Sequence, residues 1–316
     1  MSVKITYSPA YTLVPTYECF NECSYCNFRV RPGTDTWLSL KQAESKLKNL
    51  DAIELLILSG EVHPVSSRRQ AWFNHIEALC QLGLKQGFLP HTNAGPLSFE
   101  EMMQLKQVNV SMGLMLEQLT PKLLDEVHRH APSKRPEIRL QQLNWAGQLQ
   151  IPFTTGLLLG IGETKADWEE TLAAIANSHQ RYGHVQEVIL QPHQPGERQR
   201  LPGPPCDDAM LLSATRLARN ILPNDITIQI PPNLVQTSKA LIACLEAGAR
   251  DLGGIGPIDE VNPTYHHQHL SKLKAFLQSH GYTLSRRLPI YPSYEDWLNP
   301  LLRQKVQPWR TRLDLE

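Results

Sequence analysis

The sequence has no excess charge of either sign and no long apolar run. Its 316 residues hold 31 Lys and Arg against 31 Asp and Glu, so the formal net charge is +0. A surface that binds nucleic acid normally leaves a basic excess, so nucleic acid is not expected as the main partner. No apolar run approaches the roughly 20 residues that a membrane helix needs, so no membrane partner is expected either.

A secretory signal is also lacking. Residues 1–15 have no basic stretch followed by a long apolar one, which predicts a cytoplasmic protein. Thiols stay reduced in that compartment, so the six cysteines are expected to be ligands, reactive groups or core residues rather than disulfides. Cys80 and Cys244 lie in helical apolar patterns and are expected to pack as small hydrophobic residues.

What the sequence does have is a repeated pattern of a short apolar run followed by a longer amphipathic stretch. Segments 55–58 and 157–159 are apolar throughout, as is typical of strands buried on both faces of a parallel sheet. Eight such units in one chain of this length predict an α/β fold, a TIM-type (βα)8 barrel, with a doubly wound sheet as the alternative. The expected strands are 11–14, 53–58, 87–90, 108–115, 153–159, 185–191, 226–230 and 249–252.

The domain organisation predicted from this pattern is simple. No convincing linker interrupts the repeat, so residues 1–316 are expected to form a single barrel domain. A C-terminal extension at about 285–316 follows the eighth unit and is expected to cover one end of the barrel.

Three cysteines lie close together, directly after the first expected strand. Cys19, Cys23 and Cys26 have the spacing C-x3-C-x2-C. A structural zinc site needs four ligands, and the nearest later Cys or His, His63, is far outside the spacing of compact zinc modules. A disulfide framework is disfavoured by the compartment and by the odd number. The spacing therefore favours an iron–sulfur cluster, because three cysteines leave one iron of a [4Fe–4S] cluster open to a substrate or cofactor.

This motif, with Tyr25 before its third cysteine, resembles that of the radical S-adenosylmethionine (SAM) superfamily. The resemblance implies that SAM chelates the open iron through its amino and carboxylate groups. It also implies that an electron from the cluster cleaves SAM, and that the resulting 5′-deoxyadenosyl radical abstracts a hydrogen atom. The cofactors it predicts are a [4Fe–4S] cluster and SAM, with Tyr25 beside them.

Two glycine-containing segments resemble SAM-binding parts of that superfamily. Ser59-Gly60-Glu61, after the second expected strand, is similar to a GGE segment that holds the SAM amino group, with Ser59 in place of the first glycine. The segment 156–163, which includes Gly160 and Glu163, is similar to one whose backbone contacts adenine. Glycines allow a backbone to approach a flat ring closely. Without the resemblance, the first segment would indicate only a turn after a strand.

Two charged residues are assigned by the same resemblance. It implies that Glu117, at the end of the fourth expected strand, binds the ribose hydroxyls of SAM. It implies that Arg139 pairs with the SAM carboxylate, a contact that suits a planar guanidinium. The simpler alternatives are an acid at a helix start for Glu117 and an exposed helix face for Arg139.

From residue 7 to about 298 the chain also resembles one narrower family, the radical SAM subunits that close the ring in 7,8-didemethyl-8-hydroxy-5-deazariboflavin synthesis. The similar stretches are 16–29 (TYECFNECSYCNFR), 87–96 (GFLPHTNAGP), 109–120 (NVSMGLMLEQLT), 128–134 (HRHAPSK), 155–163 and 251–263. The resemblance implies conversion of 5-amino-5-(4-hydroxybenzyl)-6-(D-ribitylimino)-5,6-dihydrouracil to the deazaflavin of coenzyme F420, with loss of ammonia. It also implies a partner subunit that attaches the 4-hydroxybenzyl group of tyrosine and supplies this substrate, and a reduced ferredoxin or flavodoxin as electron donor.

Polar residues near the carboxyl ends of the other expected strands are candidates for substrate contacts, because barrel active sites form there. A phenol, a uracil and a polyol call for amide and imidazole groups between apolar walls. The candidates of this kind are Asn93, Gln191, His193 and Asn262. A general base is also needed, and His91 and Asp259 are the two candidates, between which the sequence does not decide.

Two other functions stay open from the sequence. A sister radical SAM enzyme, such as the tyrosine-attaching partner subunit or a menaquinone-pathway futalosine enzyme, would share the cysteine motif, but the segments at 155–163 and 251–263 favour ring closure. A non-catalytic iron–sulfur protein is the second alternative. The SAM-related residues argue against it, because an electron carrier has no need of a SAM pocket; these residues are Gly60, Glu61, Glu117, Arg139 and Glu163.

Overall fold

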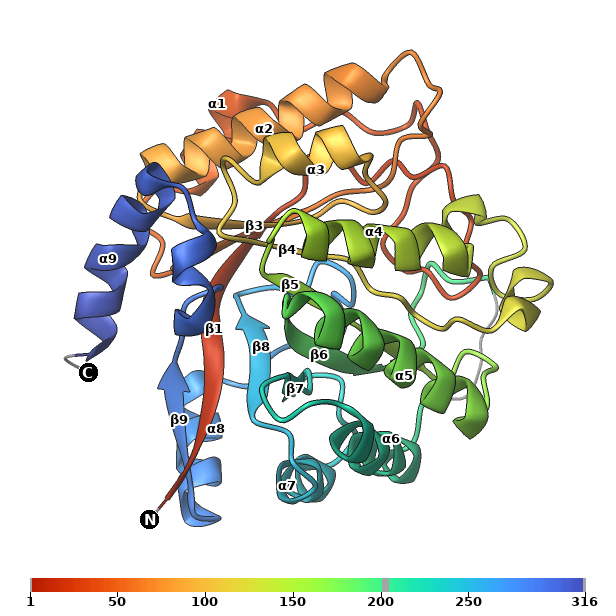
Figure 1. The fold of residues 1–316 in the computed structure, drawn as a ribbon, viewed down its shortest axis with the longest axis vertical. Helices are drawn as coiled ribbons and strands as arrows, with labels where there is room; N and C mark the ends of the chain where they lie inside the picture. Colours follow the sequence, from red (N-terminus) through yellow and green to blue (C-terminus); the bar gives the residue numbers. More distant parts are fainter. Residues whose placement is uncertain (1, 201–204, 315–316) are drawn as a thin grey trace.

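The structure is a computed structural model that describes residues 2–200 and 205–314. Eight parallel strands alternate with helices, in the order β2-β3-β4-β5-β6-β7-β8-β1, and β1 pairs with β2 to close the ring (Figure 1). This confirms the predicted TIM-type barrel and excludes the doubly wound sheet. The barrel strands are β1 (Val3–Leu13), β2 (Glu54–Leu58), β3 (Leu89–Asn93), β4 (Ser111–Gly113), β5 (Phe153–Leu159), β6 (Val185–Pro192), β7 (Thr227–Gln229) and β8 (Asp251–Ile255).

The helices lie outside the strands, and side chains between the two layers form the core. They are α1 (Leu40–Lys46), α2 (Arg69–Lys85), α3 (Phe99–Leu105), α4 (Pro136–Gln148), α5 (Lys165–Tyr182), α6 (Asp208–Ile221), α7 (Ser238–Glu246) and α8 (Leu270–Ser279). Three of them begin at capping boxes, in which Ser39, Ser98 and Thr164 accept from the third helical backbone N–H. Among the described residues no helix has the length and apolar character needed to cross a membrane.

The first strand is longer than expected. It begins at Val3 rather than near residue 11, because its three parts pair with three different strands. Residues Val3 to Tyr7 pair with β9 (Tyr282–Arg286), Thr6 to Pro9 pair with β8, and Ala10 to Leu13 pair with β2. These partners lie far away in the sequence, so local pattern did not reveal the first half of the strand.

Two other expected elements differ in the structure. The third strand was expected at 87–90 but spans Leu89–Asn93, which brings His91 and Asn93 into the strand itself. Residues 121–150, whose amphipathic pattern predicts helix in two pieces, form two 3-10 turns, η1 (Pro121–Leu124) and η2 (Pro132–Lys134), followed by α4. Proline begins each of these three pieces, because it fits the first turn of a helix but not its interior.

The C-terminal segment lies against the amino-terminal end of the barrel. After β9 it forms the 3-10 turn η3 (Pro292–Trp297) and helix α9 (Pro300–Asp314), on the same side of the molecule as the start of β1 (Figure 1). Trp309 Nε1 donates to the carbonyl of Gly87 at 2.8 Å, and Asn299 Nδ2 donates to that of Gln107 at 3.1 Å. Gly87 and Gln107 precede β3 and β4, so the opposite end of the barrel is the one available for a site.

Candidate active site

Two adjoining cavities lie at the carboxyl ends of the strands and in the barrel interior. The first lies between the loop after β1 and the ends of β2 to β6, and is called the rim cavity here. The second extends into the barrel between all eight strands and is called the lumen cavity. Leu58, Asn93, Met115 and Val261 line both, so a molecule in one cavity would contact a molecule in the other.

The loop that carries the three cysteines is held against the end of β2. Cys19 N donates to Val30 O at 3.2 Å, and Phe20 N donates to Glu61 O at 3.0 Å. A Cβ atom on Gly60 would lie 2.2 Å from the carbonyl oxygen of Glu18, so this close approach of loop and strand end requires glycine. Cys19, Cys23 and Cys26 all line the rim cavity.

The chemistry of these thiols fits an iron–sulfur cluster. Burial raises the pKa of Cys19 to about 11 and that of Cys23 to about 12, so metal coordination is needed to make them thiolates at neutral pH. Within the described residues, no three His, Cys, Asp or Glu side chains are arranged to hold a single metal ion. In a cluster each cysteine binds a different iron atom, so three thiols around one cavity suit a cluster better than a lone ion.

Glu61 and Arg139 meet at the wall of the rim cavity. Arg139 Nη2 lies 3.3 Å from Glu61 Oε1, and the other guanidinium nitrogens donate to the carbonyls of Ser133 and Met115. Glu61 Oε2 accepts from Asn21 Nδ2 at 2.8 Å and from the Ser133 hydroxyl. Arg139 is therefore a buried side chain of the site and not part of an exposed helix face.

Glu117 lies between β4 and β5 with Lys134 beside it. Its backbone is left-handed, with φ +60°, and forms a bridge to Leu157, which turns the carboxylate toward the rim cavity. Lys134 Nζ donates to Glu117 Oε1. Burial alone would raise the pKa of Glu117, but Lys134 and Arg139 outweigh it and hold that pKa below its usual range. Glu117 is thus kept as an ionised hydrogen-bond acceptor.

Two other expected cofactor residues also line the rim cavity. Ser59 accepts from Trp72 Nε1 at 3.0 Å and donates to Gly60 O at 2.9 Å. The Tyr25 hydroxyl lies 2.9 Å from His128 Nε2. Burial lowers the pKa of His128 to about 3, so the imidazole is neutral at neutral pH and can hydrogen-bond with Tyr25 without carrying charge.

Gly160 and Glu163, in contrast, do not line the rim cavity. The Glu163 carboxylate accepts from the backbone N–H of Gly160 at 2.7 Å and from that of Ile161 at 2.8 Å. It also accepts from Trp168 Nε1 at 3.0 Å. Gly160 has φ +88°, a conformation that glycine adopts readily. Glu163 therefore fixes the loop after β5, and Leu158, near the end of that strand, does line the cavity.

The four candidates for substrate contact all lie at the rim cavity, and one of them, Asn93, is also at its border with the lumen cavity. Asn93, Gln191, His193 and Asn262 all line the rim cavity, and Asn93 lines the lumen cavity as well. His193 Nε2 lies 3.1 Å from Gln199 Oε1, while its buried Nδ1 has no hydrogen-bond partner in the described part of the chain. These side chains approach the space between a bound cofactor and the barrel interior.

His91 and Asp259 line the lumen cavity, at different depths. Asp259 lies in the loop after β8, where its carboxylate accepts from two backbone N–H groups and from the amides of Asn233 and Asn262. His91 lies within β3, and its Nδ1 is 2.7 Å from the Ser111 hydroxyl. Burial lowers the pKa of His91, so its ring is neutral at neutral pH.

Some residues of the site were missed by sequence reasoning. Lys134, Asn21 and Ser133 contact Glu117 or Glu61 inside the rim cavity region, and Glu54 and Gln229 line the lumen cavity. Lys134 and Ser133 stand in the segment 128–134 that carried the narrower resemblance, so that segment held a signal for them. Glu54 could have been found as a single acid at the head of an otherwise apolar strand, Glu54–Leu58.

Comparisons with known proteins agree with this geometry. The family model described as "Radical SAM superfamily" matches residues 13–175, which include the cysteine loop and β2 to β5. The 7,8-didemethyl-8-hydroxy-5-deazariboflavin synthase of Trichormus variabilis is 64% identical over 96% of this chain and 91% of its own length. That of Trichodesmium erythraeum is 59% identical, with both chains covered fully.

The chain belongs to the radical SAM superfamily, in the family of these deazariboflavin synthases. Members of the superfamily use a [4Fe–4S] cluster and SAM, as the cysteine motif predicts. Solved structures of proteins with low sequence identity share the fold: an FeFe-hydrogenase maturase from Carboxydothermus hydrogenoformans gives a TM-score of 0.74 at 17% identity, covering 97% of this chain and 77% of its own. A methylornithine synthase gives 0.69 at 14% identity, covering 93% and 86%.

Proposed function

We propose that this radical SAM protein converts 5-amino-5-(4-hydroxybenzyl)-6-(D-ribitylimino)-5,6-dihydrouracil to 7,8-didemethyl-8-hydroxy-5-deazariboflavin, closing the central ring with loss of ammonia. Identity of 59% to a synthase covered over its full length supports this reaction. The structural observation that carries the proposal is the shared wall of the two cavities. A cofactor in the rim cavity and a substrate in the lumen cavity would meet at Leu58, Asn93, Met115 and Val261.

In the rim cavity, Cys19, Cys23 and Cys26 hold the cluster. When bound, the cluster and SAM supply the electron and the radical that abstracts hydrogen. Arg29, Lys134 and Arg139 are the cations that line this cavity. Arg139 and Lys134 would bind the carboxylate end of SAM, whereas Glu61 would accept from its amino group and Glu117 from its ribose hydroxyls. Glu163 supports adenine binding indirectly, because it holds the loop at Gly160 in one conformation.

Amide and imidazole groups of the rim cavity orient the part of the substrate that reaches the cofactor, with Asn93 at the border itself. Asn93, Gln191, His193 and Asn262 contribute these groups. Ring closure needs the reacting atoms held in a fixed geometry away from water, and the enclosed barrel interior meets that need. The proton released from the substrate passes to Asp259 or His91. Asp259 is two residues from Val261 at the border, whereas His91 lies deeper.

Two partners complete the proposal. The substrate comes from a subunit that attaches the 4-hydroxybenzyl group of tyrosine, and the electron comes from a reduced ferredoxin or flavodoxin in the cytoplasm. The cluster requires such a reductant because each SAM cleavage consumes one electron.

The test is anaerobic turnover with the defined substrate. The cluster is reconstituted, reductant, SAM and the 4-hydroxybenzyl adduct are added, and 5′-deoxyadenosine and the fluorescent deazaflavin are quantified together. Formation of both supports the proposal. Formation of 5′-deoxyadenosine without deazaflavin would indicate a sister radical SAM reaction. Absence of both products, with an intact cluster, would support the non-catalytic alternative.

A further inference from the structure

Three polar side chains lie deep in the lumen cavity, on three different strands. They are Glu54 at the start of β2, His91 in the middle of β3 and Gln229 at the end of β7, and they are called the lumen floor here. Their exposed fractions are 7%, 7% and 8%, so each is more than nine-tenths buried. All three side chains point inward, since alternate strand residues such as Glu54, Leu56 and Leu58 line the same cavity.

The floor groups lack the hydrogen bonds that buried polar groups normally make. Within the described residues, neither the Glu54 carboxylate nor the Gln229 amide has a hydrogen-bond partner. Both groups line the cavity, so their free donors and acceptors are available to a molecule that enters it. A Cβ atom on Gly253 would lie 2.3 Å from Gln229 Nε2. The glycine at this position therefore leaves space for the Gln229 amide.

His91 adds a third open group, because its contacts determine its tautomer. The Ser111 hydroxyl donates its only proton to Pro289 O at 2.6 Å, so His91 Nδ1 must donate to Ser111 Oγ at 2.7 Å. A neutral imidazole with its proton on Nδ1 carries a free lone pair on Nε2. A Cβ atom on Gly113 would lie 2.9 Å from that Nε2, so β4 leaves space for the ring.

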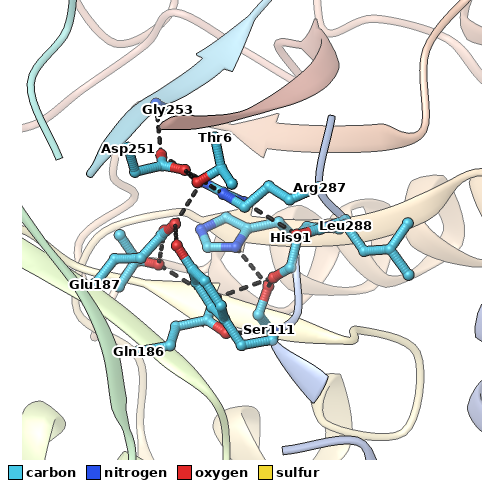
Figure 2. Close-up of polar contacts among 12 residues, drawn as sticks. Thr6, His91, Ser111, Gln186, Glu187, Asp251, Gly253, Arg287 and Leu288 are labelled. Atoms are coloured by element: carbon cyan, nitrogen blue, oxygen red, sulfur yellow. Dashed lines mark hydrogen bonds and ion pairs between the residues drawn. The ribbon is translucent and has the colours of Figure 1, made fainter. Parts of the chain in front are cut away.

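The neighbouring charged groups, in contrast, satisfy one another. Arg287 donates to both oxygens of Asp251 and to Glu187, and Asp251 also accepts from Thr6 and from the backbone of Gly253 (Figure 2). Glu187 accepts from the Tyr291 hydroxyl at 3.0 Å. Figure 2 shows His91 beside this network and directed at Ser111 rather than joined to the acids. At the floor, the open hydrogen-bonding capacity lies in Glu54, His91 Nε2 and Gln229, whereas Asn233 Oδ1 and His267 Nδ1, which have no partner in residues 2–200 and 205–314, belong to other residues of the same cavity lining.

The depth of the floor excludes it as the place of reaction. Asn93 and Leu58 line both cavities, whereas His91 is two residues and Glu54 four residues further down their strands. A strand rises about 3.3 Å per residue, so the floor lies roughly 7–13 Å below the border with the cofactor. A radical formed in the rim cavity reacts at the border, so the floor holds a part of the substrate remote from the reacting atoms.

We propose that the lumen floor is the subsite for the polyol chain of the substrate; this rests on the proposed function. Each hydroxyl of a polyol both donates and accepts a hydrogen bond. Glu54 and His91 Nε2 accept such donors, and the Gln229 amide both accepts and donates. Two other ligands fit less well. An ammonium ion has no acceptor for the Gln229 amide N–H groups, and a phenol has one hydroxyl for three protein partners. In this arrangement His91 binds a hydroxyl, and Asp259 is the base at the border.

The test compares ligands with and without the polyol. The probes are the ribityl deazaflavin product and the same ring with an N-ethyl group in place of the ribityl chain. Their Kd values for the cluster-reconstituted protein are measured by fluorescence for wild type, Glu54→Gln and Gln229→Met. Glu44→Gln, on the exposed surface of α1, serves as the matched control. Uncoupled 5′-deoxyadenosine formation from SAM checks that each variant keeps an intact rim cavity.

We expect wild type and Glu44→Gln to bind the ribityl ligand at least 100-fold more tightly than the ethyl ligand. The preference should fall at least tenfold in Glu54→Gln and in Gln229→Met, with Kd for the ethyl ligand changed less than threefold. Three results would each overturn the subsite. They are an equal rise in Kd for both ligands in the variants, a preference for the ribityl ligand that the variants keep, and no such preference in wild type. Failure of wild type to turn over the substrate would instead contradict the proposed function, because the binding comparison does not depend on turnover.

Discussion

Lys134 and Glu117 form an ion pair in the rim cavity, with only 12% and 10% of their side chains exposed. The pair joins the short turn η2 to the segment between β4 and β5, and the lysine also lies near the thiol of Cys23. A cation at this point keeps Glu117 ionised and compensates negative charge from the cysteine loop. The pair thus connects the cluster side of the cavity to the side assigned to the SAM ribose.

Replacement of Lys134 by Met should leave the Glu117 carboxylate without its cation. We expect unfolding free energy to fall by about 2 kcal/mol, because a largely buried charge loses its partner. We also expect the Kd for SAM to rise roughly tenfold, since a misplaced or protonated Glu117 no longer accepts from the ribose. Equilibrium binding of SAM to the reconstituted protein, with denaturant unfolding alongside, measures both effects.

Lys41→Met is the matched control for this variant, because Lys41 lies on the exposed surface of α1 and lines neither cavity. If Lys134→Met gave the same SAM affinity as Lys41→Met and wild type, the role of the Glu117–Lys134 pair in the cofactor site would be wrong.

Replacement of Cys23 by Ala should abolish both the cluster and SAM cleavage. Two cysteines do not hold a [4Fe–4S] cluster firmly, so we expect iron content and visible absorbance to be lost after reconstitution, and no 5′-deoxyadenosine. Cys80→Ala is the control, because that thiol is buried beside Thr92 and Asn109, away from the rim cavity. Deoxyadenosine formation that survives in Cys23→Ala would contradict the cluster assignment.

The parts of the fold that sequence predicted are those set by local pattern. The fifth strand, expected at 153–159, is found at those residues because all seven of them are buried and either apolar or small. The start of β1 and the whole of β9 were missed, because Val3 and Tyr282 pair only with each other across the length of the chain. No local periodicity records such a pairing.

The site residues that could be predicted from sequence are likewise those in contiguous motifs, and the others depend on the tertiary structure. The cysteine spacing and the segment at Glu61 lie in contiguous motifs, so they could be found from sequence. Lys134 reaches Glu117 only because Pro132 and Pro136 break the expected helix into separate turns. Glu54 on β2 and Gln229 on β7 line the same cavity only because the barrel closes. Composition and spacing do not encode that closure.

Replacement of Glu163 should affect SAM binding without direct contact. In Glu163→Ala the N–H groups of Gly160 and Ile161 lose their acceptor, and the loop after β5 becomes free to move. We expect KM for SAM to rise roughly tenfold with kcat changed less than twofold, because only cofactor positioning is affected. Glu163→Gln keeps one accepting oxygen, so its KM for SAM should lie between those of wild type and Glu163→Ala. An unchanged KM in Glu163→Ala would exclude this positioning role.

Replacement of Asp259 by Asn should separate the two products of turnover. SAM cleavage does not need this carboxylate, so 5′-deoxyadenosine should still form, while deazaflavin should fall at least 100-fold because the proton acceptor at the border is lost. In His91→Asn the main effect should be a higher Kd for the ribityl product. Normal deazaflavin formation by Asp259→Asn would show that Asp259 is not the general base.

The buried carboxyl of Glu187 should make stability depend on pH. Burial raises its pKa from 4.5 to about 7, so the folded chain binds this proton more tightly than the unfolded chain does. Its contribution to stability is therefore fully present below about pH 4.5 and is lost as pH rises through 7. Relative to Glu187→Gln, we expect the unfolding free energy of the cluster-free wild type to fall as pH rises over that range. Glu44→Gln should follow the wild-type curve. Parallel curves for wild type and Glu187→Gln would show that this carboxyl is already ionised below pH 5, held so by Arg287.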